Sequence, residues 1–249
     1  MRPIVLIPAR LASTRLPNKP LADIAGKPMI VQVLLRAQAA QVGPVAVACA
    51  EEEIAAAVEA AGGQAIMTEP GLPSGSDRIH QALQRLDPER QHDVVINVQG
   101  DLPSLPPEDL TAALKPLEDP ACDIATLAAR ITEPAERSSP DVVKIAAALS
   151  LQNPVARALY FSRAPIPWAG ADDSAPLFHH IGLYAYRREA LEQFVALPPS
   201  PLEQRERLEQ LRALEAGLRI DVALVDSIPL GVDTPADLER ARRLLSQAP

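Results

Sequence analysis

The sequence predicts an α/β protein with three layers, in which a mainly parallel sheet is covered by helices on both faces. Two observations predict it. The candidate strands are continuous apolar runs, as in sheets buried on both faces, and helical patterns separate them along the chain. The 249 residues are 47% hydrophobic, which is enough for one large globular domain.

In the first half of the chain, strand and helix patterns alternate regularly. Pro28 suits the first position of a helix, where its missing N–H costs nothing, and Gly62 and Gly63 end another helix. The predicted elements are strand 4–7, helix 29–40, strand 45–49, helix 52–61, strand 65–67, helix 77–86 and strand 94–98. In such sheets ligands bind beyond the carboxyl ends of the strands.

The second half is less regular, with a proline-broken stretch at 163–168 followed by a polar loop at 169–176. No internal repeat or low-complexity linker divides the chain. We therefore expect a single domain over 1–249, with an inserted or appended segment around 130–200. The predicted elements are helix 107–114, strands 124–129, 142–147 and 181–186, helices 189–195 and 201–216, strand 220–225 and helix 235–245.

The composition excludes several classes of protein. A net charge of −8 argues against a nucleic-acid partner, which needs a basic face. No apolar run is long enough to span a membrane or to act as a signal peptide, so we expect a cytoplasmic protein without a membrane partner. Cys49 and Cys122 lie far apart and form no CxxC pair, so we expect both to be buried apolar residues.

The loop that follows the first strand is basic, although the chain as a whole is acidic. Arg10, Arg15 and Lys19 lie within ten residues, and residues 1–22 contain no acid. Small residues around Ser13 expose backbone N–H groups, so the loop suits a polyphosphate. It contains neither the GxGxxG nor the GxxxxGK fingerprint. The alternative is a solvated basic loop.

Two aspartates are candidate metal ligands. Asp101 follows an apolar strand on a Gly-Asp turn, where a carboxylate suits Mg²⁺ together with substrate phosphates. Asp233 precedes a helix start at which Thr234 is the expected N-cap and Pro235 the first helical residue. Each aspartate also has a purely structural interpretation, as part of a turn or beside a helix cap.

Other motifs carry less chemistry. His179 and His180 have no Cys, His or Asp at the spacing of a zinc site. The pattern over 201–212 is typical of a solvated amphipathic helix. No GxSxG nucleophile motif is present, and nucleotidyl transfer needs none, because a substrate oxygen can attack.

Eight segments in order resemble one family. The segments IPARLASTRLPNKPL, GKPM, SGSDR, NVQGD, YFSRAPIPW, HHIGLYAYR, SPLEQ with LEQLR, and GVDTPADLE are similar to those of the 3-deoxy-manno-octulosonate (Kdo) cytidylyltransferases, the CMP-Kdo synthetases. The similarity runs from about residue 3 to 244. The resemblance implies a GT-A-like nucleotide-diphospho-sugar transferase fold and the Mg²⁺-dependent reaction of CTP with Kdo to give CMP-Kdo and diphosphate. It also implies a cytoplasmic homodimer that serves lipopolysaccharide biosynthesis, with the segment around 130–200 used for sugar-acid binding and dimerisation.

The resemblance assigns site residues position by position. The catalytic residues are Lys19, Arg15 and Asp101, and the metal ligands are Asp101 and Asp233. The nucleotide-binding residues are Arg10, Ser13, Arg15, Lys19, Ser74, Gly75 and Arg78. The sugar-acid-binding residues are Gln99, Arg163, His180, Tyr184, Glu209 and Gln210.

The implied mechanism is in-line attack by the anomeric 2-hydroxyl of the sugar acid on the α-phosphorus of CTP. Mg²⁺ between Asp101 and Asp233 would lower the pKa of that hydroxyl. A second Mg²⁺ could accompany the β- and γ-phosphates, where Lys19 and Arg15 would stabilise the departing diphosphate.

Three departures from the family pattern leave specificity open. The chain has Cys49 and Ala50 where many relatives have Thr-Asp, which affects base recognition and the choice of CTP over UTP. It has Leu102 where many have Glu, and Ser76-Asp77 where many have Thr-Glu. Another ulosonic acid, such as 8-amino-Kdo or a sialic or pseudaminic acid, therefore remains an alternative substrate. A catalytically silent nucleotide sensor and a Rossmann dehydrogenase are the alternatives from other classes.

Overall fold

The computed structural model describes residues 1–12, 16–168, 175–226 and 228–246. It groups into two compact units, Met1–Thr111 with Pro229–Pro249, and Ala112–Ile228. The segment around 130–200, singled out in the sequence, falls in the second unit. The single-domain boundary of 1–249 and the dimerisation role of that segment stay predictions.

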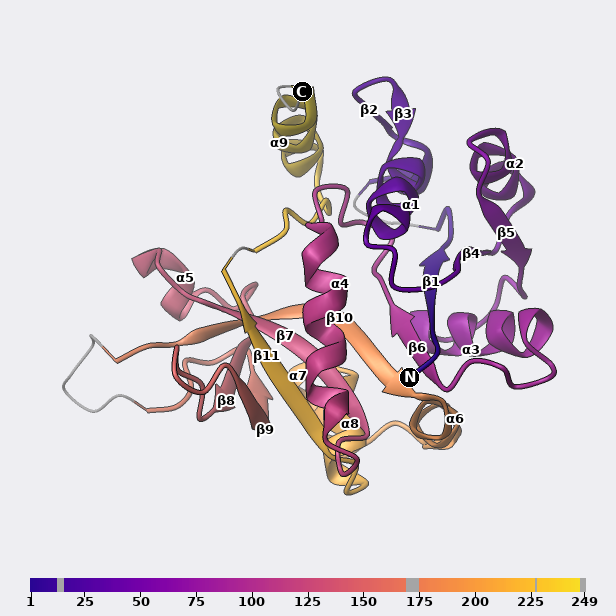
Figure 1. Ribbon diagram of the computed structural model, residues 1–249. Coiled ribbons are helices and arrows are strands. Elements are labelled where there is room, and N and C mark those ends of the chain that lie inside the picture. Colours follow the sequence, from indigo (N-terminus) through magenta and orange to yellow (C-terminus); the bar gives the residue numbers. More distant parts are fainter. Residues whose placement is uncertain (13–15, 169–174, 227, 247–249) are drawn as a thin grey trace. The chain divides into compact units, whose positions relative to one another are not determined.

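The first unit is built on four parallel strands (Figure 1). Their order across the sheet is β5 (Gln64–Met67), β4 (Val45–Cys49), β1 (Pro3–Ala9) and β6 (Val94–Asn97). The central strand β1 is fully apolar from Ile4 to Ile7, and these four side chains are at most 1% exposed. Neighbours on both sides and helices on both faces explain why its apolar run is continuous.

Three helices connect these strands: α1 (Met29–Ala39), α2 (Glu52–Ala60) and α3 (Gly75–Leu86). The chain moves outward from β1 to β4 to β5 and then returns to β6 on the far side of β1. Right-handed crossovers therefore place α1 and α2 on one face and α3 on the other. This unit has the predicted three layers. Pro28 is the N-cap residue of α1 and not, as predicted, its first helical residue.

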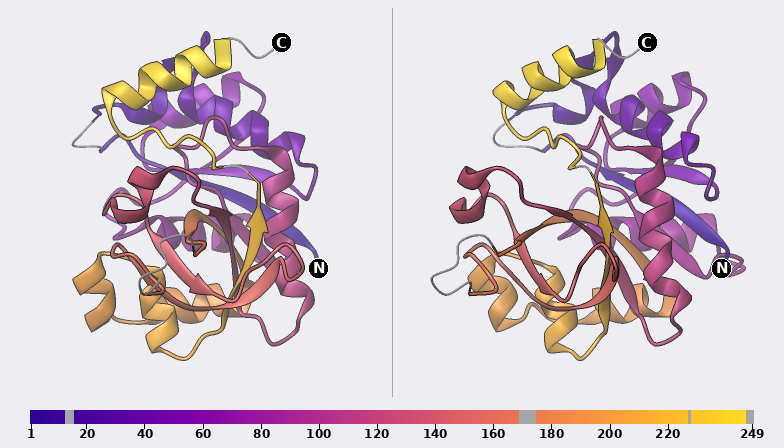
Figure 2. Two further views of the ribbon diagram at one scale, coloured as in Figure 1. Left: turned by 90° about the vertical axis from the view of Figure 1, so that its left-hand side faces the viewer. Right: turned by 60° about the vertical axis from the view of Figure 1, so that its left-hand side comes forward.

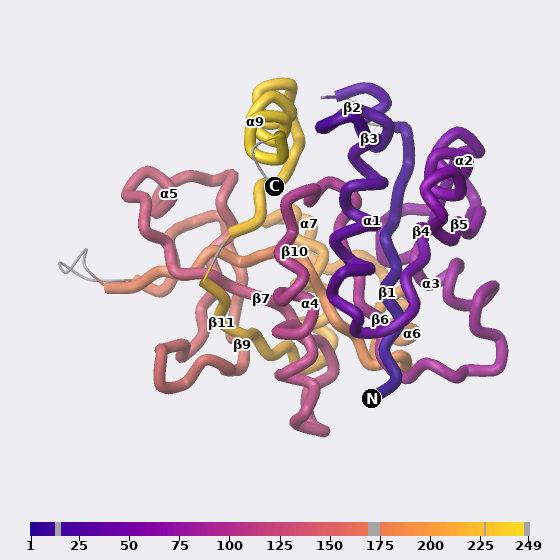
Figure 3. The backbone as a smooth tube through the Cα atoms, turned by 45° about the horizontal axis from the view of Figure 1, so that its top comes forward, coloured from indigo at the N-terminus to yellow at the C-terminus, as the bar shows by residue number. Residues whose placement is uncertain are grey.

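The last helix of the described chain packs beside a short pair of strands that follows the basic loop (Figure 3). Helix α9 (Pro235–Ser246) contacts the short strand β2 (Asp23–Ile24), which pairs with β3 (Lys27–Pro28). A small apolar core joins the two regions, and Arg242 Nε donates to the carbonyl of Asp23 at 2.9 Å. The buried members of this core are Ile24, Met29, Val232, Leu238 and Ala241.

The second unit contains a closed ring of five strands (Figure 2). Their order is β10-β7-β11-β9-β8, and the ring closes where His179 of β10 pairs with Lys144 of β8. The five strands are β7 (Ile124–Arg130), β8 (Lys144–Ala147), β9 (Val155–Ser162), β10 (Phe178–Arg187) and β11 (Ile220–Val225).

The prediction of a mainly parallel sheet is wrong for this unit. Among its described pairings only β7 with β11 is parallel, and the other four are antiparallel. For the pair of β8 and β9 the physical reason is that no described helix lies between the two strands, and a parallel pair needs a long crossover connection. Strand β9 was not predicted at all.

The helix predicted over 201–216 is two helices, α7 (Pro201–Glu206) and α8 (Gln210–Glu215). Arg207 between them has a left-handed backbone with φ of 56°, and Leu208 turns inward to 6% exposure. The Glu206 carboxylate accepts hydrogen bonds from Ser162 Oγ and the Arg163 N–H. Because these partners are remote in sequence, local periodicity gave no sign of the break.

The remaining elements agree with the sequence to within a few residues or are short turns of helix. In the described part of the chain, no helix has both the length and the apolar character needed to cross a bilayer. Cys49 and Cys122 are buried and unpaired by disulfides, as predicted, and burial raises the pKa of each thiol to about 12. The further elements are η1 (Lys19–Leu21), α4 (Pro107–Leu114), η2 (Lys115–Glu118), α5 (Pro134–Ser138) and α6 (Arg188–Ala196).

The close approach of the α1–β4 loop to β1 generates a stability prediction. A Cβ on Gly43 would lie 2.2 Å from the carbonyl oxygen of Pro3, a backbone atom that cannot rotate away. We expect Gly43→Ala to lower the free energy of unfolding by about 1–3 kcal/mol. The control is Gly71→Ala, whose Cβ would meet nothing within 4 Å. Urea denaturation of both variants measures the difference, and equal stabilities would contradict this view of the loop.

Candidate active site

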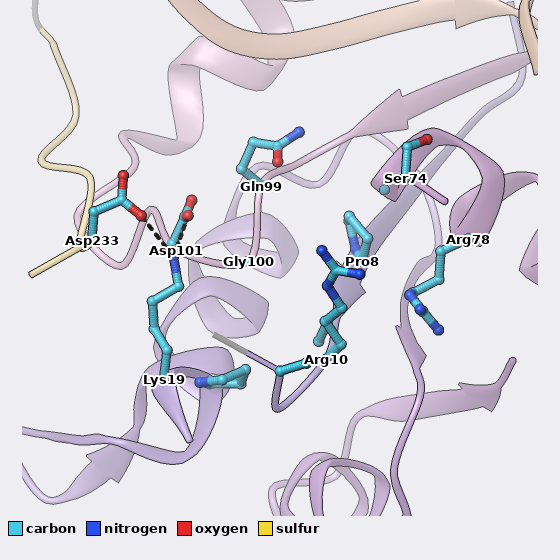
Figure 4. A pocket seen from close by; sticks show the side chains of 13 residues that line it. Pro8, Arg10, Lys19, Ser74, Arg78, Gln99, Gly100, Asp101 and Asp233 are labelled. Carbon is cyan, nitrogen blue, oxygen red and sulfur yellow. Dashed lines mark hydrogen bonds and ion pairs between the residues drawn. The ribbon is translucent and has the colours of Figure 1, made fainter. Parts of the chain in front are cut away.

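A polar cavity of about 400 Å³ lies at the carboxyl ends of β1 and β6 in the first unit (Figure 4). This is the edge at which parallel α/β sheets bind ligands. Its lining includes three cationic side chains and two carboxylates. The lining residues are Pro8, Ala9, Arg10, Ala12, Lys19, Pro20, Ser74, Gly75, Arg78, Gln99, Gly100, Asp101 and Asp233.

Gly100 lets the ends of β1 and β6 come together. A Cβ at this position would lie 2.8 Å from the carbonyl oxygen of Pro8 and 3.4 Å from Ile30 Cδ1. Only glycine fits this approach without a shift of the backbone. The turn it permits presents Gln99 and Asp101 at the cavity.

The N-terminus of helix α3 forms one wall of the cavity. Ser74 is its N-cap and accepts a hydrogen bond from the N–H of Asp77 at 3.2 Å, while its hydroxyl donates to the Asp77 carboxylate at 2.7 Å. Gly75 is the first helical residue, and Ser74 and Gly75 both line the cavity. The N–H groups and the positive dipole at this end of a helix favour an anion.

The segment that returns from the second unit carries the second aspartate to the site. The N–H of Val232 donates to the carbonyl of Asp101 at 3.0 Å. This backbone hydrogen bond holds the next residue, Asp233, close to Asp101. Thr234 and Asp237 cap α9 reciprocally: the N–H of Asp237 donates to Thr234 Oγ1, and the N–H of Thr234 donates to the Asp237 carboxylate. This is the cap predicted from the sequence.

Lys19 lies between the two aspartates (Figure 4). Its ammonium donates to Asp101 Oδ2 at 2.7 Å and to Asp233 Oδ1 at 3.0 Å. The Lys19 side chain is only 16% exposed. Burial works against its charge, but Asp101 and Asp233 outweigh this effect and raise the pKa of the ammonium above its ordinary value. The point where the two carboxylates converge therefore holds a positive charge.

The same point suits a divalent cation. Asp101 and Asp233 supply carboxylate oxygens, which Mg²⁺ prefers, and Mg²⁺ commonly binds through one or two carboxylates together with waters and substrate phosphates. Among the described residues, no group of three or more His, Cys, Asp or Glu side chains could hold a metal. The donor set thus fits a metal that shares its ligands with a phosphate substrate better than an all-protein metal cage.

The opposite side of the cavity is cationic, with Arg10 from the end of β1 and Arg78 from α3 (Figure 4). Arg78 is 2% exposed, and its guanidinium donates to Thr68 Oγ1 at 2.6 Å and to the carbonyls of Glu69 and Pro70. Burial and the neighbouring charge of Arg10 lower the pKa of Arg78. Two like charges held this close favour an anion between or beside them.

The structure brings together most of the predicted nucleotide and metal residues. Arg10, Lys19, Ser74, Gly75, Arg78, Asp101 and Asp233 all line the one cavity. Gln99, predicted for the sugar acid, lines it too. Ser13 and Arg15 lie outside the described residues. The other predicted sugar-acid residues belong to the second unit.

In the second unit, His180 is enclosed by the strand ring. It is 7% exposed, its Nε2 lies 3.0 Å from Thr126 Oγ1, and the Phe161 ring packs edge-on at 4.9 Å. Burial, with a smaller contribution from His179, lowers the pKa of His180 to about 3. The imidazole is therefore neutral near pH 7 and can offer a substrate a hydrogen bond but no positive charge.

Tyr184 lies next to the His180 ring, and the charge of Glu209 acts on Tyr184. The Tyr184 ring is 5.5 Å from that of His180, and burial together with the charges of Tyr186 and Glu209 raises the pKa of its phenol. Gln210 is 7% exposed, and within the described part of the chain its side-chain nitrogen Nε2 has no hydrogen-bond partner. A buried amide donor of this kind is suited to an acceptor oxygen of a ligand.

Arg163 is held by backbone carbonyls. Its Nε donates to the carbonyl of Glu206 at 2.9 Å, and its Nη1 donates to that of Pro140 at 2.9 Å. The fully buried ammonium of Lys144 donates to the carbonyl of Arg163 itself at 2.9 Å. These contacts fix the guanidinium, while its role towards a sugar carboxylate stays a prediction.

Several residues that shape the two sites were missed in the sequence. Thr126 fixes His180, and Glu206 and Lys144 fix Arg163, but each lies in an ordinary strand or helix pattern without a local signal. The Gly-Asp turn at Gly100 was predicted, but the close backbone approach that requires a glycine there was not, although a glycine at a strand end can indicate one.

Comparisons with known proteins give a consistent result. Residues 4–220 match the cytidylyltransferase family. A 3-deoxy-manno-octulosonate cytidylyltransferase of Parvibaculum lavamentivorans is 62% identical and covers 98% of this chain and 93% of its own, and one of Rhodopseudomonas palustris is 63% identical and covers 97% of each. A solved structure of CMP:2-keto-3-deoxy-manno-octonic acid synthetase complexed with CTP is similar, with a TM-score of 0.89, 42% identity and 99% of each chain covered.

An ion pair between α7 and α8 predicts that the stability of the protein depends on pH. Arg212 donates to Glu203 through two hydrogen bonds of 2.5 and 2.8 Å. These bonds lower the pKa of Glu203 below its ordinary 4.5. The pair's contribution to stability is therefore complete above pH 4.5 and is lost as the pH falls through the lowered pKa.

We expect Glu203→Gln to lower the free energy of unfolding at pH 7 by about 1–2 kcal/mol. The glutamine can preserve the capping box with Ser200, so the change removes the charge and one of the two acceptors of Arg212. The deficit should shrink below pH 4, as measured by urea denaturation across pH. The control is Glu118→Gln at an exposed position. A deficit that does not change with pH would contradict the assignment.

Proposed function

The chain belongs to the 3-deoxy-manno-octulosonate cytidylyltransferase family, and we propose that it catalyses the reaction of CTP with Kdo to give CMP-Kdo and diphosphate. The observation that carries this proposal is the cavity of the first unit, in which two carboxylates converge on a cation and face two arginines and a helix N-terminus. That arrangement provides both a metal position and an anion position for a nucleoside triphosphate.

In the proposed reaction the protein acts mainly by positioning the substrates and by neutralising the charge of the phosphates. Arg10 and the N-terminus of α3 bind phosphate oxygens, and Arg78 adds positive charge while bracing the loop after β5. Lys19 and, from the predicted assignment, Arg15 stabilise the charge that develops on the departing diphosphate. The attacking group is the anomeric 2-hydroxyl of the sugar acid, so no protein nucleophile is required.

Mg²⁺ is the proposed cofactor. When bound by Asp101 and Asp233, it would neutralise phosphate charge and lower the pKa of the attacking hydroxyl. Asp101 is positioned for this by the Gly100 turn, and Asp233 by the backbone bond between Val232 and Asp101. Because the two ligands come from distant parts of the chain, both tethers are needed to keep the carboxylates together.

The residues that we assign to the sugar acid are those predicted for it from the sequence: Gln99, Arg163, His180, Tyr184, Glu209 and Gln210. The neutral imidazole of His180 and the amide of Gln210 suit sugar hydroxyls. Arg163 is the candidate for the carboxylate, because a guanidinium can pair with a carboxylate in a fork.

Membership of the family supports the wider context of the proposal. The fold is proposed to be of the GT-A-like nucleotide-diphospho-sugar transferase type, and the active form a homodimer. The product would enter lipopolysaccharide biosynthesis from the cytoplasm. Cys49 is fully buried and Ala50 is 6% exposed, so discrimination between CTP and UTP cannot depend on a polar side chain at either position.

The proposed reaction is tested by diphosphate release. We expect turnover with CTP and Kdo and none with ATP, GTP or UTP, and the activity should disappear with EDTA. A panel that adds 8-amino-Kdo and a sialic acid compares the alternative substrates. Turnover with one of these in place of Kdo would move the assignment to that acid, and no turnover with any pair would overturn the proposal.

The contact between Lys19 and Asp101 predicts how much kcat falls when either side chain is changed. We expect Asp101→Asn and Lys19→Ala each to lower kcat by at least about a hundredfold, equivalent to roughly 3 kcal/mol of transition-state stabilisation. Asp23→Asn, an exposed aspartate on β2, is the matched control and should keep normal turnover. Circular dichroism confirms that each variant is folded, and near-normal turnover in either site variant would contradict the assignment.

Replacing Gln210 should weaken the binding of the sugar acid without lowering the stability of the fold. We expect Gln210→Met to raise KM for Kdo by about tenfold, since one hydrogen bond to the substrate is lost. The free energy of unfolding should be unchanged or higher, because Nε2 of Gln210 has no hydrogen-bond partner in the described part of the chain. Exposed Gln204→Met is the control. If KM for Kdo stays unchanged, Gln210 does not contact the sugar acid.

A further inference from the structure

The ammonium of Lys19 donates to two carboxylates, which is not expected of a residue that only binds phosphate. Its ammonium lies 2.7 Å from Asp101 Oδ2 and 3.0 Å from Asp233 Oδ1, on the carboxylate side of the cavity and not beside Arg10 (Figure 4). A cation at this point neutralises the same two carboxylates that are proposed to hold the metal. The ammonium and a divalent ion therefore compete for one position.

The backbone of Lys19 is fixed, while its side chain can turn. Lys19 begins the short helix η1, the N–H of Ala22 donates to its carbonyl, and the N–H of Met29 at the start of α1 donates to the carbonyl of Ala22. Beyond this anchor, lysine has a flexible four-carbon stem and a compact charge without directional geometry. The ammonium can thus exchange one set of oxygens for another without moving the main chain.

The two carboxylates require a positive charge between them. Their oxygens accept from one nitrogen, and at this separation two unscreened carboxylates raise each other's energy. The lysine supplies one positive charge against two negative ones, whereas a divalent cation supplies two. Lys19 therefore keeps the two carboxylates together with half the charge that a divalent cation would bring.

We propose that Lys19 is an exchangeable internal counter-ion of the metal position. Before nucleotide binds, its ammonium occupies that position and weakens the binding of divalent cations. When a triphosphate enters the cavity, the ammonium transfers to the phosphate oxygens and the divalent ion takes its place between Asp101 and Asp233. Metal and nucleotide then bind with positive coupling, and each raises the affinity of the other by the same factor. This inference rests on the proposed function.

The experiment measures metal binding without nucleotide. Mn²⁺ binding to the full chain is followed by electron paramagnetic resonance for the unaltered protein and for Lys19→Met, Lys19→Arg and Lys27→Met. We expect Lys19→Met to bind Mn²⁺ about tenfold or more tightly, since a unit charge is removed from beside the ion. Lys19→Arg keeps that charge and should bind as weakly as the unaltered protein. Lys27→Met changes an exposed lysine of β3 and is the matched control.

Two further measurements keep the result interpretable. Adding Asp233→Asn to Lys19→Met should abolish the gain in Mn²⁺ affinity, which locates the ion at the proposed position. Mg²⁺ alone should raise the melting temperature of Lys19→Met more than that of the unaltered protein, which also shows that the variant is folded. With CTP present the order should reverse, because Lys19→Met can no longer bind the phosphates.

The outcome that overturns the inference is an unchanged or lower Mn²⁺ affinity in Lys19→Met without nucleotide. Lys19 would then be a permanent structural partner of the two aspartates. Failure of the proposed function appears separately, as absence of diphosphate release with CTP and any ulosonic acid. The metal titration contains neither substrate, so the two failures cannot be confused.

Discussion

The convergence of Asp101 and Asp233 on the ammonium of Lys19 is the interaction on which the first unit depends. These three residues come from the loop after β6, the segment that returns from the second unit, and the loop after β1. Bringing two carboxylates together is unfavourable unless a cation lies between them. The same requirement that holds the site together makes it a place where a divalent ion can bind.

Apolar packing and backbone contacts in the rest of the first unit hold these three residues in place. The apolar strand β1 fixes the start of the basic loop, and Gly100 allows the end of β6 to approach it. The apolar core under α9 holds the returning segment, and the backbone bond between Val232 and Asp101 aligns the two aspartates. Burial of apolar side chains thus supplies the free energy that keeps charged groups in a fixed geometry.

The second unit holds its polar groups by burial and by hydrogen bonds. Its strand ring encloses His180, whose imidazole is kept neutral by burial and oriented by Thr126. The break between α7 and α8 positions Gln210, and the Glu206 carboxylate at that break binds the start of the segment that carries Arg163. Neutral donors in a buried setting suit the hydroxyl groups of a sugar, as the cationic cavity of the first unit suits phosphates.

The sequence by itself determined the longer helices and strands of the first unit, because continuous apolar strands, glycine helix ends and the Thr234 cap are all local signals. The resemblance to the family also predicted which residues line the cavity of the first unit, while their roles towards nucleotide and metal stay predictions. Only the tertiary structure decided the antiparallel ring, the break at Arg207 and the position of Lys19 between the aspartates. These features depend on partners far apart in the chain, such as Glu206 with Ser162 and Asp101 with Asp233, and periodicity within a segment carries no information about them.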